Sequence, residues 1–429
     1  MLSRLDLRAF NGDTAALASL LARPGGDDEP VAAVREIIAA VRERGDAALR
    51  ELTARFDGCA IDDLRVSGGE MDAALDGVSA EFGAALRYAR AEITAYHEAQ
   101  RGPEVRVERD GVTLRELVVP VDRAGLYVPG GRAAYPSTVL MTAIPAQVAG
   151  VREIALCVPP DRDGHIAAPT LAAAALVGIT EVYRVGGAQA IAAMAYGTDT
   201  IRAVDVIVGP GNVYVALAKR EVAGVVGIES MAGPSELVVV ADDTASADNV
   251  AADLLAQAEH GPDGAAVLVT WSETVVDAVD RAIDTLLATA GRRDDIEATL
   301  GSGGRAILVD GPDAAMRVAN VIAPEHLELM TVDPDALVLL VRNAGAVFCG
   351  PWAPAVVGDY VAGVNHVLPT ARTARFASAL RVDDFRKHVH VVDVDEAALH
   401  RIAPHIAAFA AVEGLDAHAR AVAMRTAPS

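Results

Sequence analysis

Cysteine, aromatic residues and positive charge are all scarce in this 429-residue chain. The three cysteines, Cys59, Cys157 and Cys349, are too few and too widely spaced for a disulfide framework or a CxxC zinc site, which favours a reducing compartment. Only 37 Lys and Arg stand against 59 Asp and Glu, so the net charge is −22. A negatively charged surface disfavours the binding of nucleic acid and of anionic lipid. We therefore expect a cytoplasmic protein without nucleic-acid or membrane partners.

Long uncharged apolar runs are also missing. The longest spans 166–179, contains a proline and is shorter than the roughly 18 residues that cross a bilayer. The first 14 residues mix charges into every few positions, so we expect no secretory signal. Hydrophobic residues nevertheless make up 52% of the chain, which excludes global disorder and allows large cores. The length predicts at least two domains.

The hydrophobic patterning changes along the chain. The early part shows the spacing of amphipathic helices, whereas later segments alternate short Val-, Ile- and Leu-rich runs with Ala-rich stretches of helical length. Strands alternating with helices predict βαβ units. We predict an α/β fold with two incomplete Rossmann-like doubly wound domains between helical N-terminal and C-terminal segments. The expected limits are 1–111 for the mainly helical N-terminal segment, 112–234 and 235–375 for the two domains, and 376–429 for the helical tail, which is a candidate dimer element.

Ten short runs are expected to form buried strands of these two domains. In chain order they read TLRELVVPV, GLYVP, EIALCVPP, EVYRVGG, AVDVIVGPGN, SELVVVAD, AAVLVTW, RAILVDG, ALVLLV and GAVFCG.

Glycine-rich turns in the chain are candidates for nucleotide binding. The only near match to GxGxxG, at 301–306, precedes an expected strand and therefore indicates a plain turn. Three other turns follow expected strands, namely YVPGGRAAYPS, VGGAQAIAAM and VGPGNVYVA. Each one alone is explained as a tight βα turn, but three at one sheet edge favour a nucleotide site built from backbone amides. Gln189 and Asn212 add amide groups to two of these turns.

Most ionisable residues with catalytic potential lie in the second half. They occur as four pairs, Gln257 with His260, Glu325 with His326, Asp359 with His366, and Glu413 with His418. A single helical histidine is more often structural than a ligand. Taken together, Gln257, His260, Asp359 and His418 offer nitrogen and oxygen ligands without a thiolate, a set that suits Zn²⁺.

The other polar residues suit proton transfer and hydrogen bonding. Glu325 and His326 would then remain available as acid and base. Ser235 offers a hydrogen-bonding hydroxyl, although its neighbour Pro234 equally indicates a turn.

These motifs resemble the histidinol dehydrogenase family over nearly the whole chain. The matching blocks are GLYVPGGRAAYPSTVLM, VGGAQAIAA, VGPGNVYV, MAGPSELVV, DLLAQAEHGPD, APEHLEL, GDYVAGVNHVLPT and EGLDAHARAV. The resemblance implies a zinc-dependent homodimer that oxidises L-histidinol to L-histidine by way of L-histidinaldehyde. It also implies that two NAD⁺ are reduced per turnover, in the last two steps of histidine biosynthesis.

The resemblance also implies roles for individual residues. The zinc ligands would be Gln257, His260, Asp359 and His418, with His418 reaching into the partner's site. Glu325 and His326 match the acid–base pair. Ser235, His366 and Glu413 match positions that contact the substrate, as do the four zinc ligands and the acid–base pair. Tyr127, Gln189 and Asn212 match nucleotide-binding positions.

Four alternatives stay open at this point. The same ligands could serve a zinc hydrolase with Glu325 as base, or a dehydrogenase of another amino alcohol. Two α/β lobes could also form a non-catalytic small-molecule binding protein. A thiol-dependent aldehyde dehydrogenase would need a reactive cysteine. Cys157 lies within an apolar strand and Cys349 ends one, so we expect both to be structural.

Overall fold

The computed structural model of this chain describes residues 2–10, 12–21, 30–130, 133–230, 233–261 and 263–427. The chain divides into two compact units. The larger unit comprises Met1–Gln100 and Asp122–Phe385, and the smaller unit comprises Arg101–Val121 and Arg386–Ser429.

The first sheet of the larger unit is parallel and has five strands in the order β6-β5-β4-β7-β8. The strands are β4 (Arg123–Tyr127), β5 (Glu153–Val158), β6 (Glu181–Arg184), β7 (Val206–Val208) and β8 (Gly227–Ile228). The helices that connect them are α6 (Pro136–Ala149), α7 (Ala168–Leu176), α8 (Gly187–Tyr196) and α9 (Val213–Val222). Numbered from β4, this order is 3-2-1-4-5, that of a doubly wound sheet whose direction switches between β4 and β7.

Helices from the beginning of the chain cover this sheet. They are α2 (Val31–Arg44), α3 (Asp46–Phe56), α4 (Gly68–Gly77) and α5 (Ala80–Ala99). The apolar face of α2 is formed by Val34, Ile37, Ile38 and Val41, whose spacing places them on one side of the helix. This face joins the core around α8, which explains why these helices belong to the first α/β half.

The second sheet is also parallel and has six strands in the order β1-β11-β10-β9-β12-β13. The strands are β1 (Ser3–Asp6), β9 (Glu236–Ala241), β10 (Ala265–Thr270), β11 (Gly304–Leu308), β12 (His326–Met330) and β13 (Ala346–Cys349). The helices around them are α1 (Thr14–Leu21), α10 (Ala247–Ala258), α11 (Glu273–Leu287), α12 (Arg293–Gly303), α13 (Pro312–Ile322), α14 (Pro334–Val338) and α15 (Ala355–Tyr360). Strands β9 to β13 repeat the 3-2-1-4-5 order, so the predicted pair of incomplete Rossmann-like sheets is confirmed.

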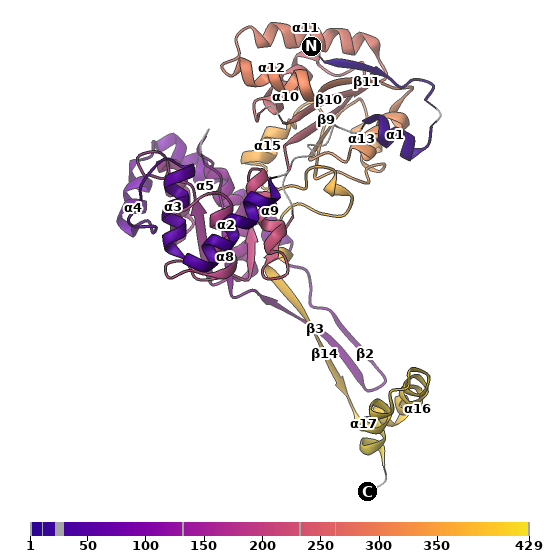
Figure 1. The fold of residues 1–429 in the computed structure, drawn as a ribbon. Helices are drawn as coiled ribbons and strands as arrows, with labels where there is room; N and C mark the ends of the chain where they lie inside the picture. Colours follow the sequence, from indigo (N-terminus) through magenta and orange to yellow (C-terminus); the bar gives the residue numbers. More distant parts are fainter. Residues whose placement is uncertain are drawn as a thin grey trace. The chain divides into compact units, whose positions relative to one another are not determined.

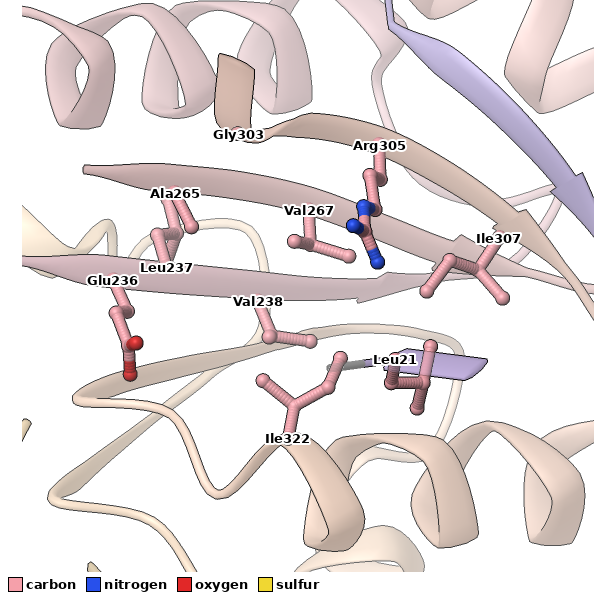
Figure 2. A pocket seen from close by; sticks show the side chains of 10 residues that line it. All are labelled: Leu21, Glu236, Leu237, Val238, Ala265, Val267, Gly303, Arg305, Ile307 and Ile322. Carbon is pink, nitrogen blue, oxygen red and sulfur yellow. The ribbon is translucent and has the colours of Figure 1, made fainter. Parts of the chain in front are cut away.

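Helices cover both faces of the second sheet. Helices α10, α11 and α12 pack on one face, and α1 and α13 pack on the other (Figure 1). A small, mainly apolar pocket lies beneath the sheet on the α13 side, where Leu21, Val238, Ile307 and Ile322 meet (Figure 2). None of the predicted site residues lines this pocket.

The smaller unit is an antiparallel sheet of three strands followed by two helices. Its strands, in the order β14-β3-β2, are β14 (Arg386–Val394), β3 (Val112–Pro120) and β2 (Arg106–Arg109). Its helices are α16 (Glu396–Glu413) and α17 (Asp416–Thr426). Throughout the described residues, no helix is long and apolar enough to cross a membrane.

Four local expectations differ from the structure. Val112–Pro120 is an antiparallel strand of the smaller unit, because the consecutive charged residues Arg115 and Glu116 place one charge on each face, which does not suit a strand buried on both faces. Arg386–Val394 is likewise a strand within the tail expected to be helical. Ser3–Asp6 precedes the N-terminal helices as an edge strand beside β11. The run at 336–341 begins within a helix, α14, because Asp333 caps it and Pro334 starts it.

Candidate functional site

The three glycine-rich turns meet at the carboxyl edge of the first sheet, where β4, β6 and β7 end. The buried Tyr127 connects them. Its hydroxyl accepts a hydrogen bond from the Gly187 backbone amide at 3.1 Å. A Cβ on Gly209, which has a φ of +126°, would lie only 2.0 Å from the Tyr127 carbonyl oxygen. The first turn includes residues 131–132, which lie outside the described part of the chain.

The two predicted amide contacts have different surroundings. Gln189 is only 1% exposed, and its Oε1 has no hydrogen-bond partner among the described residues. Asn212 is exposed and caps α9, where its Oδ1 accepts hydrogen bonds from Tyr214 N at 3.0 Å and Val215 N at 3.2 Å. The side-chain oxygen of Asn212 therefore has a structural role whether or not a nucleotide binds.

A buried ion pair that the sequence analysis missed holds the third turn in place. The Lys219 ammonium lies 2.7 Å from the carboxylate of Glu229, and both side chains are at most 3% exposed. Lys219 also donates to the Gly209 carbonyl at 3.2 Å, while Glu229 accepts from the Gly209 amide at 2.7 Å. Both polar backbone groups of Gly209 are thus bound by one ion pair. The signal in the sequence was a lysine within an otherwise buried helix face.

A second group of predicted residues lines one pocket beside the second sheet. These residues come from three elements, with Gln257 at the end of α10 and His260 just after it, His326 on β12, and Asp359 on α15. Two further carboxyl groups, Asp253 and Glu328, line the same pocket and were not predicted. Their spacing could have revealed them, because Asp253 precedes Gln257 by one helical turn and Glu328 follows His326 on the same strand face.

The acid–base pair is at the beginning of β12, the amino edge of the second sheet. His326 Nδ1 lies 3.6 Å from Glu325 Oε2, and His326 Nε2 lies 3.7 Å from Asp359 Oδ1. Burial lowers the pKa of His326, but the two carboxylates outweigh burial and raise that pKa to about 9. Burial raises the pKa of Asp359, but His326 outweighs it and holds that pKa below its usual range. Glu325 is fixed by the Glu236 amide, which donates to its Oε2 at 3.0 Å.

Ser235 and His366 also border this arrangement. Ser235 Oγ lies 3.3 Å from Gln257 Oε1. His366 Nδ1 lies 2.9 Å from the backbone oxygen of Asp359, and its Nε2 lies 3.2 Å from Thr138 Oγ1. Burial lowers the pKa of His366. His366 therefore connects the end of α15 with α6 of the first α/β half.

Glu413 and His418 belong to the smaller unit. Glu413 is the last residue of α16, and His418 lies on α17. Both are exposed. Their place in a shared site remains a prediction.

The residues that line this pocket provide only part of a metal-ligand set. Among the described residues, no group of three or more His, Cys, Asp or Glu side chains is arranged to hold an ion. Gln257, His260 and Asp359 do converge, and the buried Gln257 Nε2 has no hydrogen-bond partner within the described chain. Exchanging the two amide atoms would place an acceptor oxygen at that position and keep the contact to the Ser235 hydroxyl. The donors therefore suit a divalent cation that takes at least one more ligand.

Two half-Rossmann sheets and a buried imidazole between carboxylates define an α/β enzyme equipped for proton transfer. The sequence model for histidinol dehydrogenase matches residues 22–426. Histidinol dehydrogenase from Geobacillus kaustophilus is 52% identical over 93% of this chain and 95% of its own length. The Synechococcus enzyme of that name is 52% identical over 92% of each chain. A crystal structure of histidinol dehydrogenase from Elizabethkingia anophelis superposes with a TM-score of 0.94 at 36% identity, covering 99% of this chain and 98% of the other. The chain belongs to the histidinol dehydrogenase family and is an oxidoreductase.

Proposed function

We propose that this chain oxidises L-histidinol to L-histidine by way of L-histidinaldehyde, with zinc bound and two NAD⁺ reduced per turnover. The observation that carries the proposal is the pocket in which His326 lies between Glu325 and Asp359, beside Gln257 and His260. Family membership supports the substrate and a place in histidine biosynthesis.

Gln257, His260 and Asp359 would hold the zinc ion, with His418 of the partner as the fourth ligand. When bound, zinc would orient the nitrogen atoms of the substrate and neutralise Asp359. Neutralising that carboxylate removes one of the two charges that raise the pKa of His326. A larger fraction of the imidazole would then be neutral near pH 7, and only the neutral ring can accept a proton.

In the first oxidation, His326 would accept the hydroxyl proton of the substrate, and NAD⁺, when bound, would supply the hydride acceptor for the carbinol carbon. Glu325 then accepts a proton from the water that adds to the aldehyde. His326 would release its proton to solvent before the second oxidation, in which it would accept a hydroxyl proton of the resulting hydrate, with a second NAD⁺ as the hydride acceptor. Ser235, His366 and Glu413 would contact the substrate, so that the aldehyde stays bound between the two oxidations.

Tyr127, Gln189 and Asn212 would bind the dinucleotide. The turns after β4 and β7 flank the switch point between these two strands, which is the usual place of a nucleotide on a doubly wound sheet. A homodimer is part of the proposal because the ligand set in the pocket lacks a fourth member. The scarcity of cysteine supports a cytoplasmic location.

The direct test follows NADH absorbance when L-histidinol and NAD⁺ are added to zinc-loaded protein. We expect two NADH per histidinol, loss of activity on chelation, and its return with zinc. Glu325→Gln and His326→Gln should each lower kcat by about 10²–10⁴-fold. Zinc-loaded protein that forms no NADH would contradict the proposal and would direct attention to other amino alcohols and to hydrolysis.

The shared site has its own test. Inactive His418→Ala and Glu325→Gln proteins are mixed, unfolded and refolded together. A site that combines Glu325 of one chain with His418 of the other is intact, so about a quarter of the sites should recover in an equal mixture. Verified heterodimers without recovered activity would show that each site is built from one chain.

A further inference from the structure

Glu328 makes contacts that the proposed reaction does not use. Its side chain is buried, with 1% of its surface exposed, and it lies two residues after His326 on β12. Its Oε1 accepts a hydrogen bond from the backbone amide of Ala355 at 2.6 Å. Ala355 is the first residue of α15, and Pro354 before it provides no side-chain cap. Glu328 thus binds the beginning of the helix that carries Asp359.

Glu328 also lies beside α10, the helix that carries Gln257 and ends just before His260. Its carboxyl group is close to that of Asp253 on α10, and both line the same pocket. Asp253 precedes Gln257 and His260 by four and seven residues, so the three positions lie along one side of α10 as it ends. Burial raises the pKa of Glu328, and Asp253 raises it further, which allows the two carboxyl groups to share a proton.

We infer that Glu328 is a positioning residue that holds the beginning of α15 on β12, next to α10, and thereby sets the spacing of the proposed zinc ligands. This inference deepens the proposed function and rests on it where metal affinity is concerned. The physical reason is that α15 has only six residues and its first amide is bound by Glu328, so losing this contact frees the segment before Asp359. Residues that orient metal ligands typically change metal affinity by 10–100-fold when they are replaced.

The experiment compares three variants of the full chain by zinc competition with a chelator. Glu328→Gln keeps an acceptor for Ala355 and can donate to Asp253 without a shared proton. Glu328→Met has a similar size but no acceptor. Leu329→Val is the matched control, because Leu329 is equally buried on β12 but packs into the core on the opposite face of the sheet.

We expect zinc affinity to fall about 10–100-fold in Glu328→Met and to stay within about threefold of the parent in Glu328→Gln. Leu329→Val should lower thermal stability without changing zinc affinity. Parent-like zinc binding by Glu328→Met, or an equal loss in Glu328→Gln and Glu328→Met, would overturn the inference. If Glu328→Met does not fold, Glu328→Asp replaces it, since its shorter side chain withdraws the acceptor and should weaken zinc binding to the same extent.

A second measurement separates this inference from the proposed zinc function. Amide hydrogen exchange over 355–360 is recorded without metal in the same variants. We expect at least about tenfold faster exchange at Ala355 in Glu328→Met and parent-like exchange in Glu328→Gln and Leu329→Val. If the parent fails to bind zinc, the proposed function fails, while this exchange pattern still decides whether Glu328 holds α15. Unchanged exchange in Glu328→Met would overturn the positioning role.

Discussion

Replacing Lys219 by methionine should open the third glycine turn. The substitution removes the ammonium group and leaves the carboxylate of Glu229 buried without its cation. Breaking a buried pair in this way costs about 3–5 kcal/mol, whereas an exposed pair is worth only about 0–1 kcal/mol. The difference rests on burial, since Lys219 and Glu229 are only 1% and 3% exposed.

The double variant Lys219→Met/Glu229→Gln tests whether the charge is the cause. The glutamine oxygen can still accept a hydrogen bond from the Gly209 amide, which lies 2.7 Å from the Glu229 carboxylate in the parent protein. No uncompensated charge remains in this variant. We expect the double variant to recover at least about half of the stability lost in Lys219→Met. Such recovery is a coupling energy between the two positions and excludes a simple sum of two independent losses.

The assay must report on the first α/β half. Both tryptophans, Trp271 and Trp352, follow strands of the second sheet, so intrinsic fluorescence does not report directly on this turn. Hydrogen exchange of peptides covering 206–229 measures the local opening equilibrium, where 3–5 kcal/mol corresponds to about 150- to 5,000-fold faster exchange. If NAD⁺ binds at this turn, the KM for NAD⁺ should rise while the KM for histidinol stays constant. Exchange within threefold of the parent in Lys219→Met would refute the reasoning.

Three further outcomes follow from single contacts. Gly209→Ala should destabilise the first half by at least about 2 kcal/mol, because the new Cβ would overlap the Tyr127 carbonyl. Gly164→Ala is the control, since Gly164 also has a positive φ but lies in open space, and equal hydrogen-exchange rates in the two variants would contradict this prediction. Arg123 outweighs burial and holds the pKa of Glu181 at about 2, so this pair stabilises the fold above about pH 4.5 and loses that effect as the pH falls toward 2. Urea midpoints should therefore fall less over that pH range in Glu181→Gln, and identical slopes would be inconsistent with it. The kcat of Cys349→Ser should stay within about twofold of the parent value, since Cys349 is an exposed residue at the end of β13. Loss of NADH formation in this variant would instead favour a mechanism that uses the thiol.

The strand pattern was largely readable from the sequence because parallel strands are buried on both faces and therefore stand out as short apolar runs. The runs around β4, β5, β9 and β10 are clear examples, with every residue of β4, β9 and β10 buried. The errors came where this rule did not apply. Val112–Pro120 is apolar enough to resemble such a strand, but it pairs antiparallel with Arg106–Arg109 across a short turn and with the distant Arg386–Val394. The pairing with the distant strand leaves no local signal in the sequence.

The location of the acid–base pair could not be derived from fold rules. Ligands of doubly wound sheets usually bind at the carboxyl ends of the strands, and the glycine turns follow that rule. His326, by contrast, lies at the amino end of β12, where α10 ends and α15 approaches. The chemistry of the residue types indicated a site, but not the sheet edge on which it would form.

By itself, the sequence determined the residue types, the alternation of strands and helices, and the family to which the chain belongs. These properties depend on neighbouring positions or on whole motifs, so a linear reading captures them. Only the tertiary structure decided that Glu328 and Asp253 join the pocket, that His326 lies between two carboxylates, and that Lys219 and Glu229 bind Gly209. Those contacts join elements whose approach is set by packing, and the burial that gives the charges their strength exists only in the folded chain.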